Sequence, residues 1–250
     1  MNLNHLTSLA KTAANEAGRV ILSIYHGFDM EIGYKDDDSP LTKADREAHE
    51  VIVKSLKETG IPVLSEEGAN VPYAIRANWD YYWLVDPLDG TKEFIKKNGE
   101  FTVNIALIHQ QKAILGVVYA PVMGWLYWGN QEEGAWKQVG EEQAKKIRAK
   151  ANAKVKTIVA SRSHLSKETE EFIAQYPGAE TISMGSSLKF LLVAEDRAQC
   201  YPRFAPTMEW DTAASQAIVE AAGRQVLTYP ELEPMKYNRE EMLNGWFLVK

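Results

Sequence analysis

The sequence predicts a mixed fold of helices and β-strands. Apolar residues recur at helical spacing near the N-terminus, at every second position in the middle, and in both patterns in turn after residue 150. The 250 residues, 45% of them hydrophobic, can bury a substantial core as one large domain or two tightly packed lobes. The charged segment 140–150 has little apolar periodicity. We therefore expect an N-terminal α+β lobe over residues 1–150 and a C-terminal α/β lobe over residues 151–250.

Two helices are predicted at the N-terminus. The first spans residues 3–24, where one apolar stripe recurs at helical spacing, and Gly27 is a suitable stop. The second follows a polar loop and runs roughly from Lys43 to Thr59, with Thr42 in the N-cap position.

Short β-prone runs follow these helices. Segments 61–64 and 81–85 are rich in β-branched, aromatic and aliphatic residues, and each leads directly into carboxylates. Alternation from residue 101, followed by further runs separated by glycine and proline, predicts an antiparallel meander over 101–128.

The C-terminal part begins with a predicted strand at 157–160, after which strands and helices are expected to alternate to the end. A helix is predicted from Thr212 to Ala222, and Gly223 is expected to adopt the left-handed conformation that ends many helices.

Composition excludes several functions. A formal net charge of -6 and a pI near 5.5 oppose binding to nucleic-acid polymers, which depends on clustered Lys and Arg. The single cysteine, Cys200, cannot form an internal disulfide, and the N-terminus lacks the pattern of a secretory signal. No apolar run approaches the roughly 20 residues that span a bilayer. We expect a cytoplasmic protein, with peripheral attachment to the cytoplasmic face of the inner membrane left open, and the oligomeric state is not readable.

The acidic segment Asp86-Pro87-Leu88-Asp89-Gly90-Thr91 is the first candidate site. Pro87 disfavours helical geometry at Asp86, and Gly90 permits a sharp turn, so both carboxylates can converge. Two close carboxylates repel each other unless one is protonated or a cation lies between them. Magnesium prefers such oxygen ligands, and the chain offers no Cys/His zinc pattern. By itself, the segment is equally typical of an Asp-rich turn.

The wider context of this segment is more specific. The string Trp83-Leu84-Val85-Asp86-Pro87-Leu88-Asp89-Gly90-Thr91-Lys92-Glu93-Phe94 occurs with Ser65-Glu66-Glu67 upstream and Glu209-Trp210-Asp211-Thr212-Ala213-Ala214 downstream. Together they resemble the signature of the inositol monophosphatase superfamily, across nearly the whole chain. The nearest branch is that of the 3'(2'),5'-bisphosphate nucleotidases. The resemblance implies a layered α/β/α/β/α sandwich, lithium sensitivity, and hydrolysis of a phosphate monoester with two or three Mg2+ ions.

The resemblance also implies roles for single residues. The metal ligands would be Glu66, Asp86, the Leu88 carbonyl, Asp89 and Asp211. Thr91 and Asp45, together with Glu66, would activate the attacking water. Structural alternatives remain: Glu66-Glu67 as an exposed acidic loop, Asp211 as a helix N-cap, and Asp45 as part of a capping box with Thr42.

Three later segments bear on the substrate. They are Ser161-Arg162-Ser163-His164, Gly185-Ser186-Ser187-Leu188-Lys189-Phe190 and Tyr201-Pro202-Arg203-Phe204, and they resemble nucleotide-contacting segments of the bisphosphate nucleotidases. Hydroxyl and N–H donors at a helix start, with Lys189 and Arg203, suit a second phosphate, and His164 suits a base. Each also has an ordinary reading as a cap, a solvated charge or a loop histidine. The expected substrate-binding residues are Gly90, Thr91, Ser163, His164, Ser186, Lys189, Arg203 and Asp211.

The implied reaction is removal of the 3'-phosphate from adenosine 3',5'-bisphosphate, giving AMP and phosphate, with its sulfated analogue as a further substrate and sulfur metabolism as the context. The alternatives are a phosphatase of the same superfamily that acts on inositol phosphates or fructose 1,6-bisphosphate, and a non-catalytic regulator that binds metal or phosphate.

Overall fold

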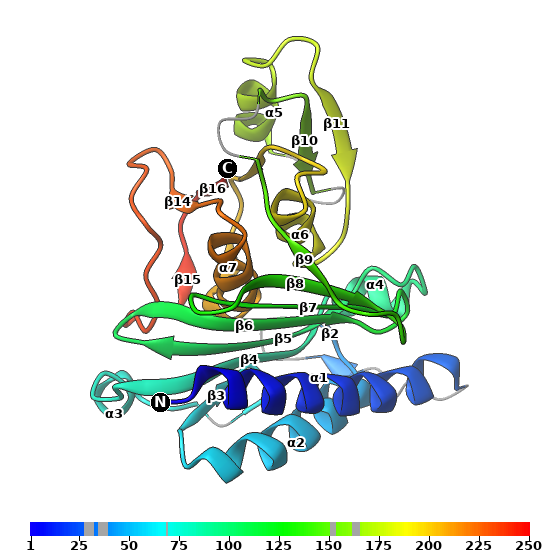
Figure 1. Cartoon of the computed structure of the whole chain (residues 1–250), viewed down its shortest axis with the longest axis vertical. Helices are drawn as coiled ribbons and strands as arrows, with labels where there is room; N and C mark the ends of the chain where they lie inside the picture. Colours follow the sequence, from blue (N-terminus) through cyan, green and yellow to red (C-terminus); the bar gives the residue numbers. More distant parts are fainter. Residues whose placement is uncertain (28–32, 35–39, 69, 151–153, 162–165) are drawn as a thin grey trace.

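The computed structural model describes residues 1–27, 33–34, 40–68, 70–150, 154–161 and 166–250. Its elements stack in layers (Figure 1). Two helices cover one face of a large sheet, two further helices cover the opposite face, and a second group of strands with a short helix lies beyond them. This arrangement is the expected α/β/α/β/α sandwich.

The first layer consists of α1 (Leu3–His26) and α2 (Lys43–Leu56), the latter continued by a 3-10 turn over Lys57–Thr59. Both predicted helices are confirmed. The alanine-rich face of α1 is fully buried together with one face of α2, and both pack on the sheet through one shared hydrophobic cluster. The fully buried residues of α2 in this cluster are Ala44, Ala48, Ile52 and Leu56. The N–H of Gly27 donates to the carbonyl of Ile24 at 3.0 Å and closes α1 as predicted.

The main sheet has seven strands in the order of the chain. They are β3 (Val63–Ser65), β4 (Tyr81–Asp89), β5 (Thr102–His109), β6 (Lys112–Ala120), β7 (Trp125–Asn130), β8 (Gly134–Val139) and β9 (Lys145–Ile147). Strands β3 and β4 are parallel and the others antiparallel, which confirms the meander. The charged segment 140–150 contains β9, so it still belongs to this sheet.

The opposite face of the sheet is covered by α6 (Leu188–Ala194) and α7 (Glu209–Ala221). Helix α7 lies directly on β6 because Gly116 has no side chain. A Cβ at Gly116 would lie 2.0 Å from the carbonyl oxygen of Ala214. Gly223 adopts the predicted left-handed conformation, with φ of 93°, just after the helix.

The outer layer combines short strands with α5 (Lys167–Ile173). Its strands are β10 (Thr157–Ala160), β11 (Glu180–Ser183), β12 (Tyr201–Arg203), β14 (Val226–Thr228) and β16 (Phe247–Val249). A bridge between Ile158 and Cys200 joins the pair β10–β11 to the sheet β12-β16-β14. The described residues after α7 contain only strands, so the expected alternation of strands and helices does not continue to the C-terminus.

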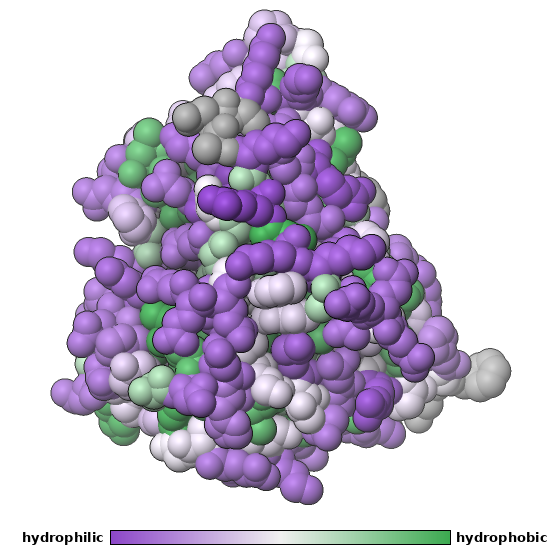
Figure 2. All heavy atoms as spheres, in the orientation of Figure 1, coloured by the Kyte–Doolittle hydropathy of each residue, from purple (hydrophilic) through white to green (hydrophobic). Residues whose placement is uncertain are grey.

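The remaining elements are small. They are α3 (Tyr73–Arg76), α4 (Thr91–Ile95), and the two-residue strands β1 (Gly33–Tyr34), β2 (Pro40–Leu41), β13 (Thr207–Met208) and β15 (Leu243–Asn244). None of the helices in the described ranges is long and apolar enough to cross a membrane. The described residues on the face shown in Figure 2 are predominantly hydrophilic.

Candidate active site

The acidic segment forms the end of β4. Asp86 pairs with Asn104 of β5 and Asp89 with Thr102, and the register shifts between these two pairs. The predicted turn is therefore a bulge inside a strand, because the ladder between β4 and β5 continues past Asp86. The N–H of Leu88 donates to Asp86 Oδ1 at 3.0 Å within the bulge. Gly90 follows as the N-cap of α4. Its φ of 93° is accessible because glycine has no side chain.

Four carboxylates from three elements meet at this end of the sheet. Glu66 follows β3 directly, and its N–H donates to the carbonyl of Val85 in β4 at 3.1 Å. Asp86 and Asp89 lie in β4, and Asp211 is the third residue of α7. The two predicted strands thus deliver their carboxylates to one place because β3 and β4 are parallel neighbours.

The charges of these carboxylates oppose one another. Burial raises the pKa of Asp86 well above its usual value, and the charges of Glu66, Asp89 and Asp211 raise it further. Burial, followed by the charges of Asp89 and Glu66, raises the pKa of Asp211 in the same way. Burial also raises the pKa of Asp89 to about 6, although the Lys189 ammonium and the Ser187 N–H oppose the shift. A bound cation would remove this repulsion.

The donor set fits a hard divalent cation, since it consists of carboxylates with a nearby backbone carbonyl. Among the described residues, no group of three or more His, Cys, Asp or Glu side chains is placed so that it could hold a metal ion as the side chains stand.

Asp45 and Thr91 lie beside the acidic segment. Asp45 is buried at the start of α2. Its Oδ2 accepts the N–H of Thr42 at 2.7 Å, and its Oδ1 accepts the hydroxyl of Thr91 at 3.2 Å. The capping box and the contact with Thr91 therefore coexist, one on each carboxylate oxygen.

Asp211 also combines two roles that the sequence left as alternatives. It is not the N-cap residue, because α7 begins two residues earlier, at Glu209. Its Oδ2 accepts the N–H of Met208 at 2.9 Å, which completes the helix cap from inside the first turn. Asp211 also lines the pocket described next.

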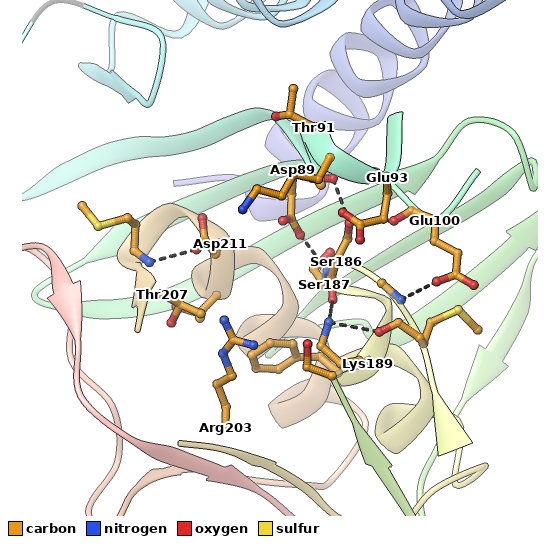
Figure 3. Close-up of a pocket in the computed structure, with 18 of the residues that line it drawn as sticks. Asp89, Thr91, Glu93, Glu100, Ser186, Ser187, Lys189, Arg203, Thr207 and Asp211 are labelled. Atoms are coloured by element: carbon orange, nitrogen blue, oxygen red, sulfur yellow. Dashed lines mark hydrogen bonds between the residues drawn. The ribbon is translucent and has the colours of Figure 1, made fainter. Parts of the chain in front are cut away.

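A pocket of about 480 Å³ opens in front of the carboxylates (Figure 3). Of the residues predicted from sequence, it brings together Glu66, Asp89, Gly90, Thr91, Ser186, Lys189, Arg203 and Asp211. Asp45, Asp86 and Leu88 are buried and do not line it. Ser163 and His164 lie outside the described residues, so their expected contacts with a nucleotide stay predictions.

The cationic side of the pocket is formed by Lys189 and Arg203. Burial lowers the pKa of Lys189 to about 8, although the charge of Asp89 acts in the opposite direction. Its ammonium donates to the carbonyls of Ser186 at 2.5 Å and Met184 at 3.3 Å. A buried ammonium facing an open pocket is a strong attraction for an anion.

The segment before α6 is bound to the acidic segment rather than free for a ligand. The hydroxyl of Ser186 donates to the carbonyls of Asp89 at 2.9 Å and Glu100 at 2.7 Å. The N–H of Ser187 donates to Asp89 Oδ2 at 2.6 Å. Of these donors, which the sequence suggested for a second phosphate, the N–H of Ser187 positions the carboxylate of Asp89, and the hydroxyl of Ser186 is engaged with backbone carbonyls.

Two residues of β5 were missed by sequence reasoning. The hydroxyl of Ser187 donates to Asn104 Oδ1 at 2.9 Å and lies 2.8 Å from that of Thr102. Both partners are fully buried polar residues in an apolar strand. Polar residues at alternate positions of that strand were the available signal, because they share one face of the sheet.

Comparison with known proteins places the chain in a family. The profile of the inositol monophosphatase family matches residues 2–243. The chain belongs to this family. The 3'(2'),5'-bisphosphate nucleotidase CysQ of Salmonella typhimurium is 50% identical over 94% of this chain and 96% of its own. The protein of the same name from Escherichia coli K12 is 49% identical over the same shares.

Solved structures agree with this assignment. The crystal structure of CysQ from Bacteroides thetaiotaomicron has a TM-score of 0.89 and 48% identity, covering 98% of this chain and 97% of the other. An inositol monophosphatase from Anabaena has a TM-score of 0.79, covering 100% of this chain and 92% of the other. At 23% identity, the latter supports the shared fold alone.

Proposed function

We propose that this chain is a magnesium-dependent nucleotidase that removes the 3'-phosphate of adenosine 3',5'-bisphosphate, giving AMP and phosphate, and that also accepts the sulfated analogue of this nucleotide. The observation that carries the proposal is that one pocket pairs carboxylates with the buried Lys189 and the half-buried Arg203. A substrate with two phosphates can occupy both sides. The names of relatives that are about half identical over nearly the whole chain support the same activity.

The carboxylates of Glu66, Asp86, Asp89 and Asp211, with the Leu88 carbonyl, would hold the ions. Bound magnesium stabilises phosphate charge and lowers the pKa of the attacking water. Asp45 Oδ1 accepts the hydroxyl proton of Thr91, which leaves the oxygen of that hydroxyl able to accept a proton from the water. Asp45 is held for this task because its other oxygen is fixed in the cap of α2. No covalent phosphoenzyme is needed.

The second phosphate would bind between Lys189 and Arg203. Lys189 is 5% exposed, so its charge acts in a medium of low polarity. Arg203 Nε is buried and has no hydrogen-bond partner among the described residues. Both side chains point into the pocket on the side away from Thr91 (Figure 3). Gly90, Ser163 and His164 complete the set that we propose to surround the nucleotide, and Ser186 lines the same pocket while its hydroxyl donates to the carbonyls of Asp89 and Glu100.

We further propose that residues 1–150 carry most of the metal ligands, and that residues 151–250 carry the nucleotide contacts and the last metal carboxylate. We propose a reducing cytoplasm as the compartment, because the single cysteine, Cys200, cannot form an internal disulfide. Nothing in the described residues supports the peripheral membrane attachment that the sequence left open.

Phosphate release with and without magnesium tests the activity. Adenosine 3',5'-bisphosphate, inositol 1-phosphate and fructose 1,6-bisphosphate should be compared at equal concentrations with the purified protein. We expect the adenosine substrate to be hydrolysed fastest, with AMP as product, and release to stop when magnesium is removed. Faster release from inositol 1-phosphate would overturn the substrate assignment. Absence of release from all three would favour a non-catalytic binder.

Replacement of Lys189 tests the role of the cationic side of the pocket separately from that of the carboxylates. In Lys189→Met, a side chain of similar length loses its charge, so binding of the second phosphate should weaken. We expect a roughly tenfold or larger fall in kcat/KM for adenosine 3',5'-bisphosphate and a smaller fall for adenosine 3'-monophosphate. Equal falls for both substrates would contradict the role of Lys189 in binding a second phosphate.

A further inference from the structure

Residues 184–187 connect β11 to α6, and we call them the α6 entry segment. All four residues line the pocket (Figure 3). At one end of the segment, the N–H of Ser187 orients Asp89. The proposed mechanism assigns no task to the other end, at Met184 and Gly185.

The α6 entry segment directs the ammonium of Lys189. An ammonium group has three protons to donate. The ammonium of Lys189 donates to the carbonyls of Ser186 at 2.5 Å and Met184 at 3.3 Å. Among the described residues no further acceptor binds this ammonium, so its third proton can serve an anion in the pocket that Lys189 lines. The direction of that proton therefore depends on where the two carbonyls lie.

Glu100 holds the first peptide of the α6 entry segment. It lies between α4 and β5 and lines the same pocket (Figure 3). Its Oε2 accepts the N–H of Gly185 at 2.7 Å. That N–H belongs to the same planar peptide as the carbonyl of Met184, and the two groups of a trans peptide point in opposite directions. A carboxylate on one side of this peptide thus turns the carbonyl on the other side toward Lys189.

The close approach of Glu100 to the segment is built into the backbone. A Cβ at Gly185 would lie 2.7 Å from the carbonyl oxygen of Glu100 and 2.8 Å from its Cβ, so only glycine fits there without a shift. The same carbonyl accepts the hydroxyl of Ser186 at 2.7 Å. The segment therefore rests directly on Glu100, through both its backbone and its side chain.

The charge of Glu100 is unfavourable for its location. A carboxylate near an anion-binding cation repels the anion and weakens its binding. A residue retained there at that cost needs a compensating task, and the hydrogen bond to Gly185 supplies one. An ionised acceptor also holds an N–H more firmly than a neutral one.

We infer that Glu100 is a positioning residue for the cationic side of the pocket, and that it keeps the ammonium of Lys189 directed at the second phosphate by holding the peptide between Met184 and Gly185. The inference rests on the proposed function, in which Lys189 binds that phosphate. Glu100 acts through Lys189 and needs no contact with a reacting group. Its side chain is not required at the other end of the segment, where Ser187 orients Asp89.

Replacement of Glu100 tests the inference with adenosine 3',5'-bisphosphate and adenosine 3'-monophosphate, which differ in the second phosphate. Glu100→Ala should lower kcat/KM about five- to tenfold for the first and less than about twofold for the second, because Lys189 loses its fixed direction. Glu100→Gln should recover most of the loss, since its amide oxygen can accept the N–H of Gly185. The magnesium concentration for half-maximal release should stay within about twofold of the original value, because Ser187 still holds Asp89.

Glu93 provides a matched control. It lines the same pocket, and although burial lowers the pKa of Lys189, the charges of Glu93 and Glu100 both act in the opposite direction. Glu93→Ala removes the same charge and leaves the bond between Glu100 and Gly185, so the ratio of kcat/KM between the two substrates should stay near that of the original protein. Gly185→Ala disturbs the contact from the other side and should lower this ratio as Glu100→Ala does.

Thermal unfolding should show that these variants remain folded. Equal falls for both substrates in Glu100→Ala, an equal effect of Glu93→Ala, or no recovery in Glu100→Gln would overturn the inference. A ratio that falls in Lys189→Met but not in Glu100→Ala would overturn it and leave the proposed function standing. If Lys189→Met leaves the ratio unchanged, the proposed binding of the second phosphate fails, and the inference fails with it.

Discussion

Without magnesium, the folded protein should lose stability as the pH rises from about 4 to 6.5. The pKa of Asp89 is about 6 in the folded state, against its ordinary value of 3.8. Because the folded state holds this proton more tightly than the unfolded chain, protonation stabilises the fold below pH 4. That contribution is lost as the pH rises through the folded pKa.

The size of this effect follows from the pKa difference. A shift from 3.8 to about 6 corresponds to about 3 kcal/mol for a fully buried group. Asp89 keeps partial exposure in the pocket, so we expect about 2 kcal/mol. For a chain of this length, that difference lowers the unfolding temperature by about 4–8 °C. The raised pKa values of Asp86 and Asp211 act in the same direction.

Thermal unfolding in metal-free buffers between pH 4 and 7.5 measures the effect. Asp89→Asn is the control, because the amide cannot ionise and its oxygen can still accept the N–H of Ser187. The difference in unfolding temperature between the two proteins isolates Asp89 from other titrating groups. At neutral pH, added magnesium should restore the unfolding temperature of the original protein and leave that of the variant nearly unchanged. A constant difference from pH 4 to 7.5 would refute this account of the site.

Three further predictions concern single residues. Asp45→Asn should lower kcat about 10²–10⁴-fold with little change in KM in a phosphate-release assay. Thr42→Ala removes the hydroxyl donated to Asp45 Oδ2 but keeps the N–H of residue 42 on that oxygen and the contact of Oδ1 with Thr91, so it should lower kcat much less. Gly90→Ala should destabilise the fold by more than about 1 kcal/mol in urea unfolding, because φ is 93° and the new Cβ would lie 2.1 Å from Ser186 Oγ. An unchanged urea midpoint of unfolding would contradict this prediction. Glu209→Ala should cost about 3–5 kcal/mol by the same measurement, since it leaves buried donors unpaired, and Glu209→Gln should recover part of the loss.

The sequence allowed much of the fold to be predicted, where periodicity was strong. The stripe of α1, the second helix with its cap, and the meander of β5 to β7 all follow local rules. The bulge in β4 could not be predicted from Asp86 and Asp89 themselves, because continued pairing with β5 decides whether such a segment becomes a turn or a strand. The position of Asp211 inside α7 was missed for a similar reason, since a local motif leaves the first residue of a helix uncertain.

The contacts of the segment before α6 were beyond sequence reasoning. Ser186 has a left-handed backbone, with φ of 50°, which residues other than glycine seldom adopt. Its hydroxyl meets carbonyls of residues far away in the chain, so no local pattern indicates the contact. Sequence motifs identified the chemical groups of the site, and tertiary packing decides which of them are free for a ligand.

The hydrogen bond from Ser187 to Asp89 joins residues that are 98 positions apart. The side chain of Asp89, which belongs to the large sheet, is thus oriented by the segment that leads into α6, a helix that packs on one face of that sheet. The affinity of the site for a cation therefore depends on how closely α6 packs against the large sheet. A change that loosens α6 should first appear as a higher cation requirement, before any melting is seen.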